Sequence, residues 1–121
     1  EQLRLALTYR DMGMIDDAIQ ALEIAARSSR YRFEASALLG RLHMDRGDRG
    51  KALEWLERAA EAPAPTIEDG RGLLYDLADV LEELGEHSRA LAVFGELQAD
   101  ASGYRDVAAR IERLSRVQVR G

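Results

Sequence analysis

Three glycines at similar intervals restrict the fold more than any other feature of this sequence. Each follows a helix-forming stretch, and each is followed five residues later by an alanine. The glycines are Gly13, Gly47 and Gly85, and the alanines are Ala18, Ala52 and Ala90. The intervals are 34 and 38 residues, and the four additional residues fall in the proline-containing stretch "EAPAPTIED". A period in the thirties around a glycine turn predicts stacked helix hairpins, because one hairpin cannot bury its apolar face alone.

The residue types around each glycine agree with this prediction. Apolar side chains recur at helical spacing on both sides of the turn, as in Leu77 and Leu81 before Gly85. Small residues occur in pairs where the two helices of a hairpin must approach closely, and a larger side chain there would overpack the hairpin. These pairs are Ala6 with Ala18, Gly40 with Ala52, and Ala78 with Ala90.

The composition favours an all-α domain of ordinary size. The chain has 121 residues, 46% of them hydrophobic, and helix formers such as Ala, Leu, Glu and Arg dominate. It has no cysteine, which excludes disulfides and thiolate metal sites but leaves the compartment open. No apolar run reaches the roughly 18 residues that a membrane span needs. Because the chain begins at Glu1 inside a predicted helix, we expect a piece of a longer protein.

The charges are unevenly distributed. Residues 1–60 carry ten acidic and ten basic side chains, residues 61–100 carry ten acidic and two basic, and residues 101–121 carry two acidic and five basic. This balance argues against nucleic acid as the main partner, because phosphate binding needs a dominant basic surface. All basic residues but Lys51 are arginine and asparagine is absent, which is typical of a GC-rich bacterial genome.

On these residues the chain resembles the tetratricopeptide repeat (TPR) family. The resemblance covers roughly residues 3–99 and rests on the small residue, the turn glycine, the alanine five later and a second alanine seven after that (Ala25, Ala59). It implies a right-handed α-solenoid of three helix-turn-helix repeats at about 1–30, 31–65 and 66–101, with a capping helix at about 103–117.

Seven helices are predicted, and Thr66 with Asp69 indicates a capping box that opens the fifth. The expected ranges are about 2–12, 14–28, 31–46, 48–62, 67–84, 86–99 and 103–117. The last helix has an apolar face, and its arginines are expected to form a solvated face of the cap. These arginines, together with one at the end of the chain, are Arg105, Arg110, Arg113, Arg116 and Arg120.

The resemblance also implies a site, because the first helix of each TPR unit lines a concave groove that holds a partner. The aligned positions in this sequence are apolar with some arginine at one end and strongly acidic at the other. The predicted groove residues are Leu3, Leu7, Arg10, Ala37, Leu38, Arg41, Met44, Tyr75, Asp76, Asp79 and Glu82. Asp76, Asp79, Glu82 and Glu83 share one helix face, where like charges repel, so helix stability gives no reason to place them together. They form either a plain solvated face or a groove for a basic and apolar peptide or helix.

Two functions from different classes remain open. The first is a protein-interaction scaffold that binds a segment of a partner in this groove. The second is a structural solenoid segment, or a module that self-associates through its uncapped N-terminal face near Leu3 and Leu7. No enzyme motif is present, and we expect neither a cofactor nor a metal. Of the two histidines, His43 is expected to pack in the interior and His87 to be exposed.

The tripeptide Arg46-Gly47-Asp48 matches an adhesion motif, but the repeat explains it better. Gly47 aligns with Gly13 and Gly85, where a left-handed residue ends a helix. Asp48 suits the positive start of the next helix. The sequence gives Arg46 no structural role.

Overall fold

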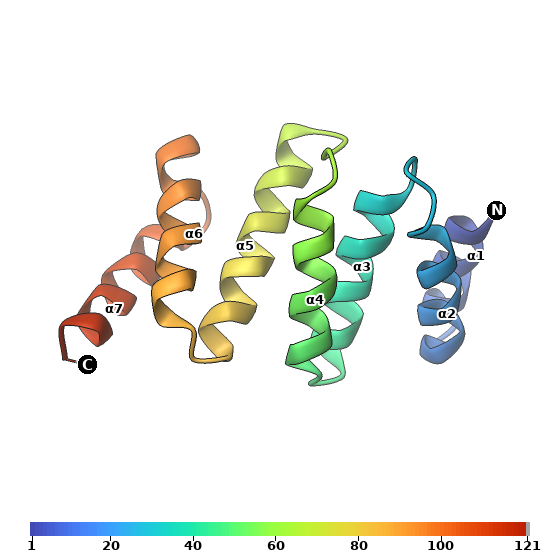
Figure 1. The fold of residues 1–121 in the computed structure, drawn as a ribbon, viewed down its shortest axis with the longest axis horizontal. Helices are drawn as coiled ribbons and strands as arrows, with labels where there is room; N and C mark the ends of the chain where they lie inside the picture. Colours follow the sequence, from blue (N-terminus) through green and yellow to red (C-terminus); the bar gives the residue numbers. More distant parts are fainter. Residues whose placement is uncertain (121) are drawn as a thin grey trace.

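Helix hairpins stacked in a row, followed by one more helix, build the described chain (Figure 1). The computed structural model describes residues 1–120, with side chains as far as Val117. In this part of the chain the helices are α1 Gln2–Asp11, α2 Ile15–Ala25, α3 Arg32–Asp45, α4 Arg49–Ala60, α5 Ile67–Glu83, α6 His87–Asp100 and α7 Val107–Arg120. Each packs against the next, and α3 also contacts α5. The predicted all-α helical solenoid is confirmed, with three hairpins and a seventh helix.

The three repeat glycines end helices in the left-handed conformation, as predicted. Their φ angles are 77° at Gly13, 79° at Gly47 and 80° at Gly85. In each turn the N–H of the next residue donates to a carbonyl five residues earlier, for example Asp48 N–H to His43 O at 2.9 Å. One turn geometry therefore sets the hairpin angle in all three repeats.

The helix starts also follow the sequence. The Thr66 hydroxyl accepts from the Asp69 N–H at 3.0 Å and caps α5, as predicted. The Asp48 carboxylate accepts from the Lys51 N–H at 3.1 Å and caps α4. The last helix begins at Val107, later than the expected position near 103, because a turn containing Gly103 at φ 85° precedes it.

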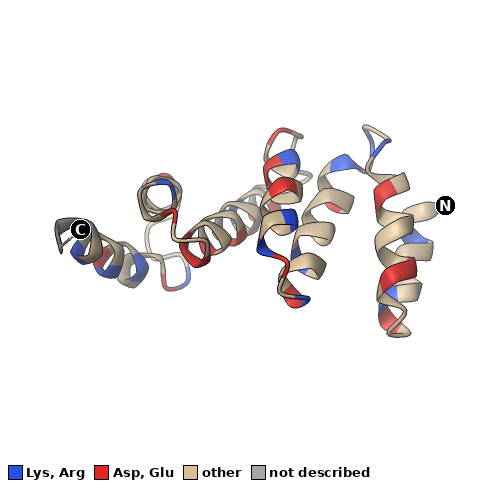
Figure 2. Ribbon diagram, turned by 60° about the horizontal axis from the view of Figure 1, so that its bottom comes forward, with Lys and Arg blue, Asp and Glu red and all other residues tan. Residues whose placement is uncertain are grey.

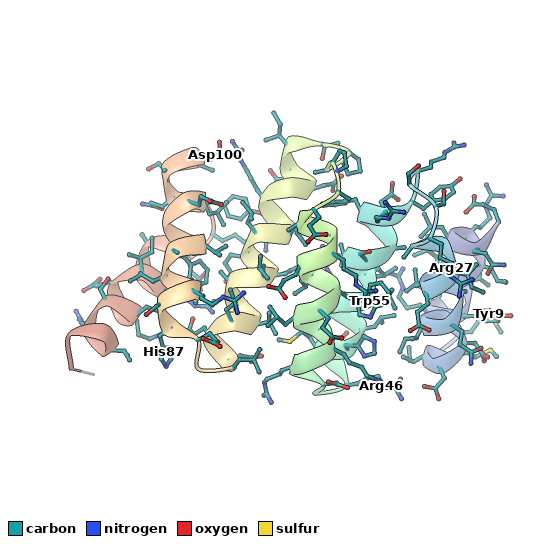
Figure 3. The ribbon with its side chains drawn as sticks, viewed as in Figure 1. Tyr9, Arg27, Arg46, Trp55, His87 and Asp100 are labelled. Atoms are coloured by element: carbon teal, nitrogen blue, oxygen red, sulfur yellow. The ribbon has the colours of Figure 1, made fainter. Side chains whose placement is uncertain are left out.

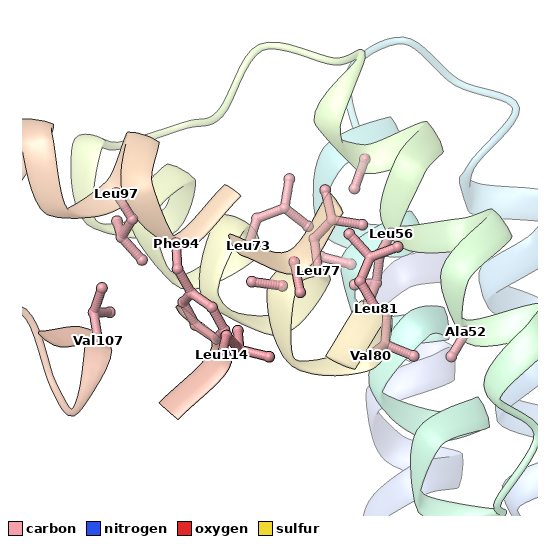
Figure 4. Packing of buried hydrophobic residues seen from close by; sticks show 14 of the residues in the cluster. Ala52, Leu56, Leu73, Leu77, Val80, Leu81, Phe94, Leu97, Val107 and Leu114 are labelled. Atoms are coloured by element: carbon pink, nitrogen blue, oxygen red, sulfur yellow. The ribbon is translucent and has the colours of Figure 1, made fainter. Parts of the chain in front are cut away.

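Two clusters of buried side chains hold the hairpins together, and α3 contributes to both. Ala35, Leu39 and Leu42 pack with α1 and α2, whereas Phe33 and Ala37 pack with α4 to α7. Figure 4 shows the second cluster, with α5 leucines between Ala52 and Leu56 of α4 on one side and Phe94 and Leu97 of α6 on the other. The N-terminal hairpin thus has its own core, joined to the rest through α3.

The predicted small-residue pairs lie inside the hairpins. Ala6, Ala18, Ala52, Ala78 and Ala90 are all fully buried. A Cβ placed on Gly40 would come within 2.5 Å of Leu56 Cδ2 and 3.5 Å of the Ala52 carbonyl oxygen. The second hairpin therefore closes more tightly than any side chain at position 40 allows.

Candidate partner-binding groove

The predicted groove residues come from the first helix of each hairpin. Leu3, Leu7 and Arg10 lie on α1, Arg41 and Met44 on α3, and Tyr75, Asp76, Asp79 and Glu82 on α5. Ala37 and Leu38 are also on α3, where Ala37 is buried and Leu38 is partly buried. We call the side on which α3 meets α5 the inner face.

An open cleft of about 370 Å³ lies on the inner face and brings four of these residues together. They are Arg41 and Met44 of α3 and Asp76 and Asp79 of α5. The inner cleft also includes four residues that were not among the predicted groove positions: Asp45, Arg49, Leu56 and Glu83. Because Gly40 lets Leu56 of α4 approach α3 closely, a buried leucine forms part of the lining.

Two ion pairs join residues on opposite walls of the inner cleft. Arg41 Nε donates to Asp76 Oδ2 at 3.1 Å, which joins α3 to α5. Arg49, at the start of α4, donates to Glu83 Oε2 at 3.4 Å. All four side chains keep substantial exposure, between 27% and 59%, so these pairs remain exchangeable with solvent or a ligand. The lining holds four carboxylates and two guanidinium groups, which gives a formal charge of 2 − 4 = −2.

The far end of the predicted acidic groove is occupied by α7. Arg110 donates through Nη2 to Asp79 Oδ1 and to Glu82 Oε1, both at 2.7 Å, and through Nη1 to the Tyr75 hydroxyl at 3.0 Å. Arg113 also donates to Glu82. Only 12% of the Arg110 side chain and 16% of the Glu82 side chain are exposed. Figure 2 shows blue basic bands on the described part of α7 and red acidic bands on α5.

Two expectations are therefore wrong. Arg110 is not part of a solvated cap face, and Asp79 and Glu82 do have a structural reason to lie together, since Arg110 of α7 pairs with both. Residues 61–100 carry an excess of acidic side chains and residues 101–121 an excess of basic ones. This difference in charge was the feature of the sequence from which the contact could have been predicted. Arg116 is exposed and pairs with Glu112 within α7, as a solvated face would. The Arg120 side chain lies outside the described residues.

Tyr75 belongs to the same contact between α5 and α7. Its hydroxyl donates to Asp106 Oδ1 at 2.5 Å. Its ring packs edge-on against the Phe94 ring, with the two ring centroids 5.9 Å apart. The Arg105 guanidinium lies 4.8 Å from the centroid of the same ring. The backbone of Arg105 has a positive φ angle of 40°. Tyr75 is thus engaged within the chain rather than open at the inner cleft.

The hydrogen bonds of this contact shift the pKa values of its ionisable groups. Burial alone would raise the pKa of Glu82, but the hydrogen bonds from Arg110 and Arg113 outweigh it, so this pKa lies below its ordinary value of 4.5. The hydrogen bond from Tyr75 lowers the pKa of Asp106. Burial, followed by the hydrogen bond to Asp106, raises the pKa of the Tyr75 phenol. The contact between α5 and α7 is therefore most stable with its carboxylates ionised.

The predicted α1 residues are not part of the inner cleft. Leu3 and Leu7 are partly buried, and Arg10 pairs with the neighbouring Asp11 at 3.2 Å. On the same hairpin Leu5 and Met12 expose 41% and 66% of their surface. The N-terminal end of the array therefore presents apolar side chains separately from the cleft.

The remaining sequence candidates have structural roles. His43 is 7% exposed, which confirms its interior position. His87 is partly buried with its Nδ1 atom away from solvent, so the expectation of an exposed histidine is wrong. Arg46 does have a role, because it pairs with Asp16 of α2 at 2.8 Å and ties the first two hairpins together. Among the described residues no cluster suits a metal ion, and no helix is long and apolar enough to cross a membrane.

The fold and its inner cleft define a helical-repeat protein of the kind that presents a surface to other proteins. A sequence profile for the tetratricopeptide repeat matches residues 3–66, just over half of the chain, and the chain belongs to the tetratricopeptide repeat family. Proteins of this family generally mediate protein–protein interaction and are typically non-enzymatic scaffolds.

Comparison with solved structures supports the same fold. A crystal structure of MamA matches with a TM-score of 0.78 and 19% sequence identity, over 93% of this chain and 64% of the MamA chain. The chain thus spans less than two thirds of that protein, and a likeness at this identity is one of fold. A search of curated protein sequences gave no match.

Proposed function

We propose that this chain is an interaction scaffold that binds a peptide or helix of a partner protein in the inner cleft between α3 and α5. The observation that carries the proposal is the cleft itself, in which Arg41, Met44, Asp76 and Asp79 surround one open space. A partly exposed methionine adapts to varied apolar side chains, which suits a binding surface. We propose that Leu3, Leu7 and Arg10 extend this surface along α1.

The charge of the inner cleft indicates the chemistry of the partner. Its lining has four carboxylates and two guanidinium groups, and one carboxylate remains in excess after Arg110 has paired with Asp79. A segment with a basic side chain beside an apolar one would complement this lining. The open end is the one near α3, because Glu82 and Tyr75 at the other end are already engaged by Arg110. We therefore expect the basic side chain of the partner to be placed by Asp76 and Glu83, whose pairs with Arg41 and Arg49 are exposed.

The test is a selection of binding peptides on the immobilised chain, followed by affinity measurements for the best peptide. Met44→Arg removes the apolar contact and adds a repelling charge, so we expect at least about a tenfold loss of affinity. Gln20→Arg places the same side chain on an exposed position of α2 and should leave affinity unchanged. Selected peptides that bind Met44→Arg as tightly as the parent chain would contradict the proposal.

A second function, self-association, is favoured by the exposed apolar side chains of the first hairpin. Leu5, Met12 and Met14 expose 41%, 66% and 40% of their surface. Packing of a second copy on α1 would cover them. Sedimentation equilibrium should then show a dimer that Leu5→Glu dissociates and that Ile67→Glu, at a 74% exposed position on α5, does not. A monomer at every concentration would exclude this function.

A further inference from the structure

A larger cavity lies on the opposite side of the array, between α2 and α4. Its volume is about 780 Å³, and it is lined by the end of α2, the start of α3 and the second half of α4. We call it the outer cavity. Its charged and aromatic lining residues are Glu23, Arg27, Arg32, Trp55, Arg58 and Glu61. Its size and its mixture of apolar and polar walls suit a ligand-sized group.

Trp55 supplies the aromatic wall of the outer cavity. It is the one tryptophan in the chain, it is partly buried, and it packs against the core of the N-terminal hairpin. The Arg58 guanidinium lies 4.5 Å from its ring. Figure 3 shows Trp55 reaching from α4 toward the side on which α2 and Arg27 lie. The cavity therefore offers a flat apolar surface next to positive charge.

The arginines of the outer cavity differ from most others in the chain. Among the described residues nine arginines form ion pairs with carboxylates: Arg10, Arg41, Arg46, Arg49, Arg71, Arg89, Arg110, Arg113 and Arg116. Arg27, Arg32 and Arg58 form none within the part of the chain that the structure describes. Arg32 instead donates to the carbonyl oxygens of Ala26 at 3.2 Å and Arg27 at 3.1 Å.

The carboxylates of the outer cavity do not neutralise these arginines. Glu23 and Glu61 line it, but neither is ion-paired with a described arginine. The formal charge of the lining is 3 − 2 = +1, opposite in sign to that of the inner cleft. Arg27 and Arg58 are both exposed, so their donors are open to a carboxylate from outside the chain.

We propose that the outer cavity is a second docking site, which binds an acidic segment of a partner protein. Carboxylates of the segment would pair with Arg27 and Arg58, and an apolar side chain between them would pack on Trp55. This site goes beyond the inner cleft and selects the opposite charge. The chain would then hold two protein segments at once, one on each side of the array.

Trp55 makes this proposal directly measurable, because all tryptophan fluorescence of the chain comes from the outer cavity. The probes are short blocked peptides in which glutamates flank a phenylalanine or a proline. Titration into the intact chain should give a saturable change in Trp55 emission that weakens as salt is added. The same peptides with glutamine in place of glutamate should give no such change.

Two charge-reversal variants locate the binding. Arg27→Glu should weaken binding at least about tenfold, because it removes one donor and repels the peptide. Arg4→Glu reverses an arginine on α1 and should bind as the parent chain does, and circular dichroism checks that both variants stay helical.

The outcomes separate this proposal from binding at the inner cleft. The outer site is overturned if no peptide gives a saturable change, if Arg27→Glu binds as tightly as the parent chain, or if inorganic phosphate produces the same signal. It is also overturned if Met44→Arg abolishes the signal, because the peptide would then occupy the inner cleft. Selected peptides that bind Met44→Arg as tightly as the parent chain, with the Trp55 signal intact, would contradict only the proposed function.

Discussion

At the scale of single residues, Gly40 is the described glycine with the least space for a side chain. A Cβ there would lie 2.5 Å from Leu56 Cδ2 and 2.6 Å from its Cγ, and Leu56 is 1% exposed, so it has no room to move. We expect Gly40→Ala to lower the free energy of unfolding by about 1–3 kcal/mol through overpacking. Urea denaturation followed by circular dichroism measures this change.

Gly95 provides the matched control for this substitution. It lies in α6 at an exposed position, and a Cβ added to it would point into open space. Gly95→Ala should raise the stability by up to about 1 kcal/mol, because alanine is the better helix former. A Gly40→Ala variant as stable as the parent chain would show that α3 and α4 can separate without cost.

His43 makes the stability depend on pH. Burial lowers its pKa below the ordinary value of 6.5, helped by the charges of Lys51 and Arg46, and this outweighs the opposing effect of Asp48. The unfolded chain therefore takes up the proton first, and stability is lost as the pH falls through about 6.5 toward the lower folded pKa. His43→Phe should remove this part of the pH dependence, as measured by urea midpoints between pH 8 and pH 5.

The control for this pH dependence is the other histidine. His87→Gln should keep the loss of stability on acidification, since His43 is intact. If His43→Phe shows the same slope as the parent chain, the pH dependence does not come from the interior of α3.

At the scale of elements, Arg110 makes more of the side-chain hydrogen bonds between α5 and α7 than any other described residue. Arg110→Ala leaves Glu82 nearly buried without its main partner, so we expect a loss of about 2–4 kcal/mol. Arg116→Ala removes only an exposed pair within α7 and should cost about 0.5 kcal/mol or less. Urea denaturation of both variants gives the comparison, and equal losses would contradict the role assigned to Arg110.

Acidification tests the same contact in the parent chain. The pKa of Glu82 is lowered in the folded state, so its contribution to stability is present above about pH 4.5 and is lost as the pH falls further. In Arg110→Ala the loss of stability below about pH 4.5 should be smaller, because the Glu82 carboxylate has lost its main partner.

At the scale of the whole molecule, the two buried clusters predict unfolding in parts. Leu22 is fully buried in the N-terminal cluster, and Leu22→Ala should cost about 2–5 kcal/mol. Because hairpins contact mainly their neighbours, we expect faster amide hydrogen exchange in α1 and α2 while α5 to α7 stay protected.

Phe94→Ala is the reciprocal experiment, since Phe94 is fully buried in the other cluster. It should increase exchange in α5 to α7 more than in α1 and α2. If either variant increases exchange evenly along the chain, the array unfolds as one cooperative unit.

The sequence alone determined the repeat, the turns and the hairpin packing. These features are local: the left-handed glycine, its helix cap and the small-residue pairs act within about 30 residues, and the same pattern occurs three times. The fold class, the position of Thr66 as a cap and the interior position of His43 could therefore be predicted.

Only the tertiary structure decided which charges are free. Asp79 and Glu82 looked like one end of an open groove, but Arg110 reaches them from 31 and 28 residues away, while Arg27 and Arg58 have no such partner among the described residues. Sequence spacing fixes which side chains share a helix face, whereas pairing between helices depends on how the hairpins stack in space. For that reason the inner cleft was predicted in part, and the outer cavity not at all.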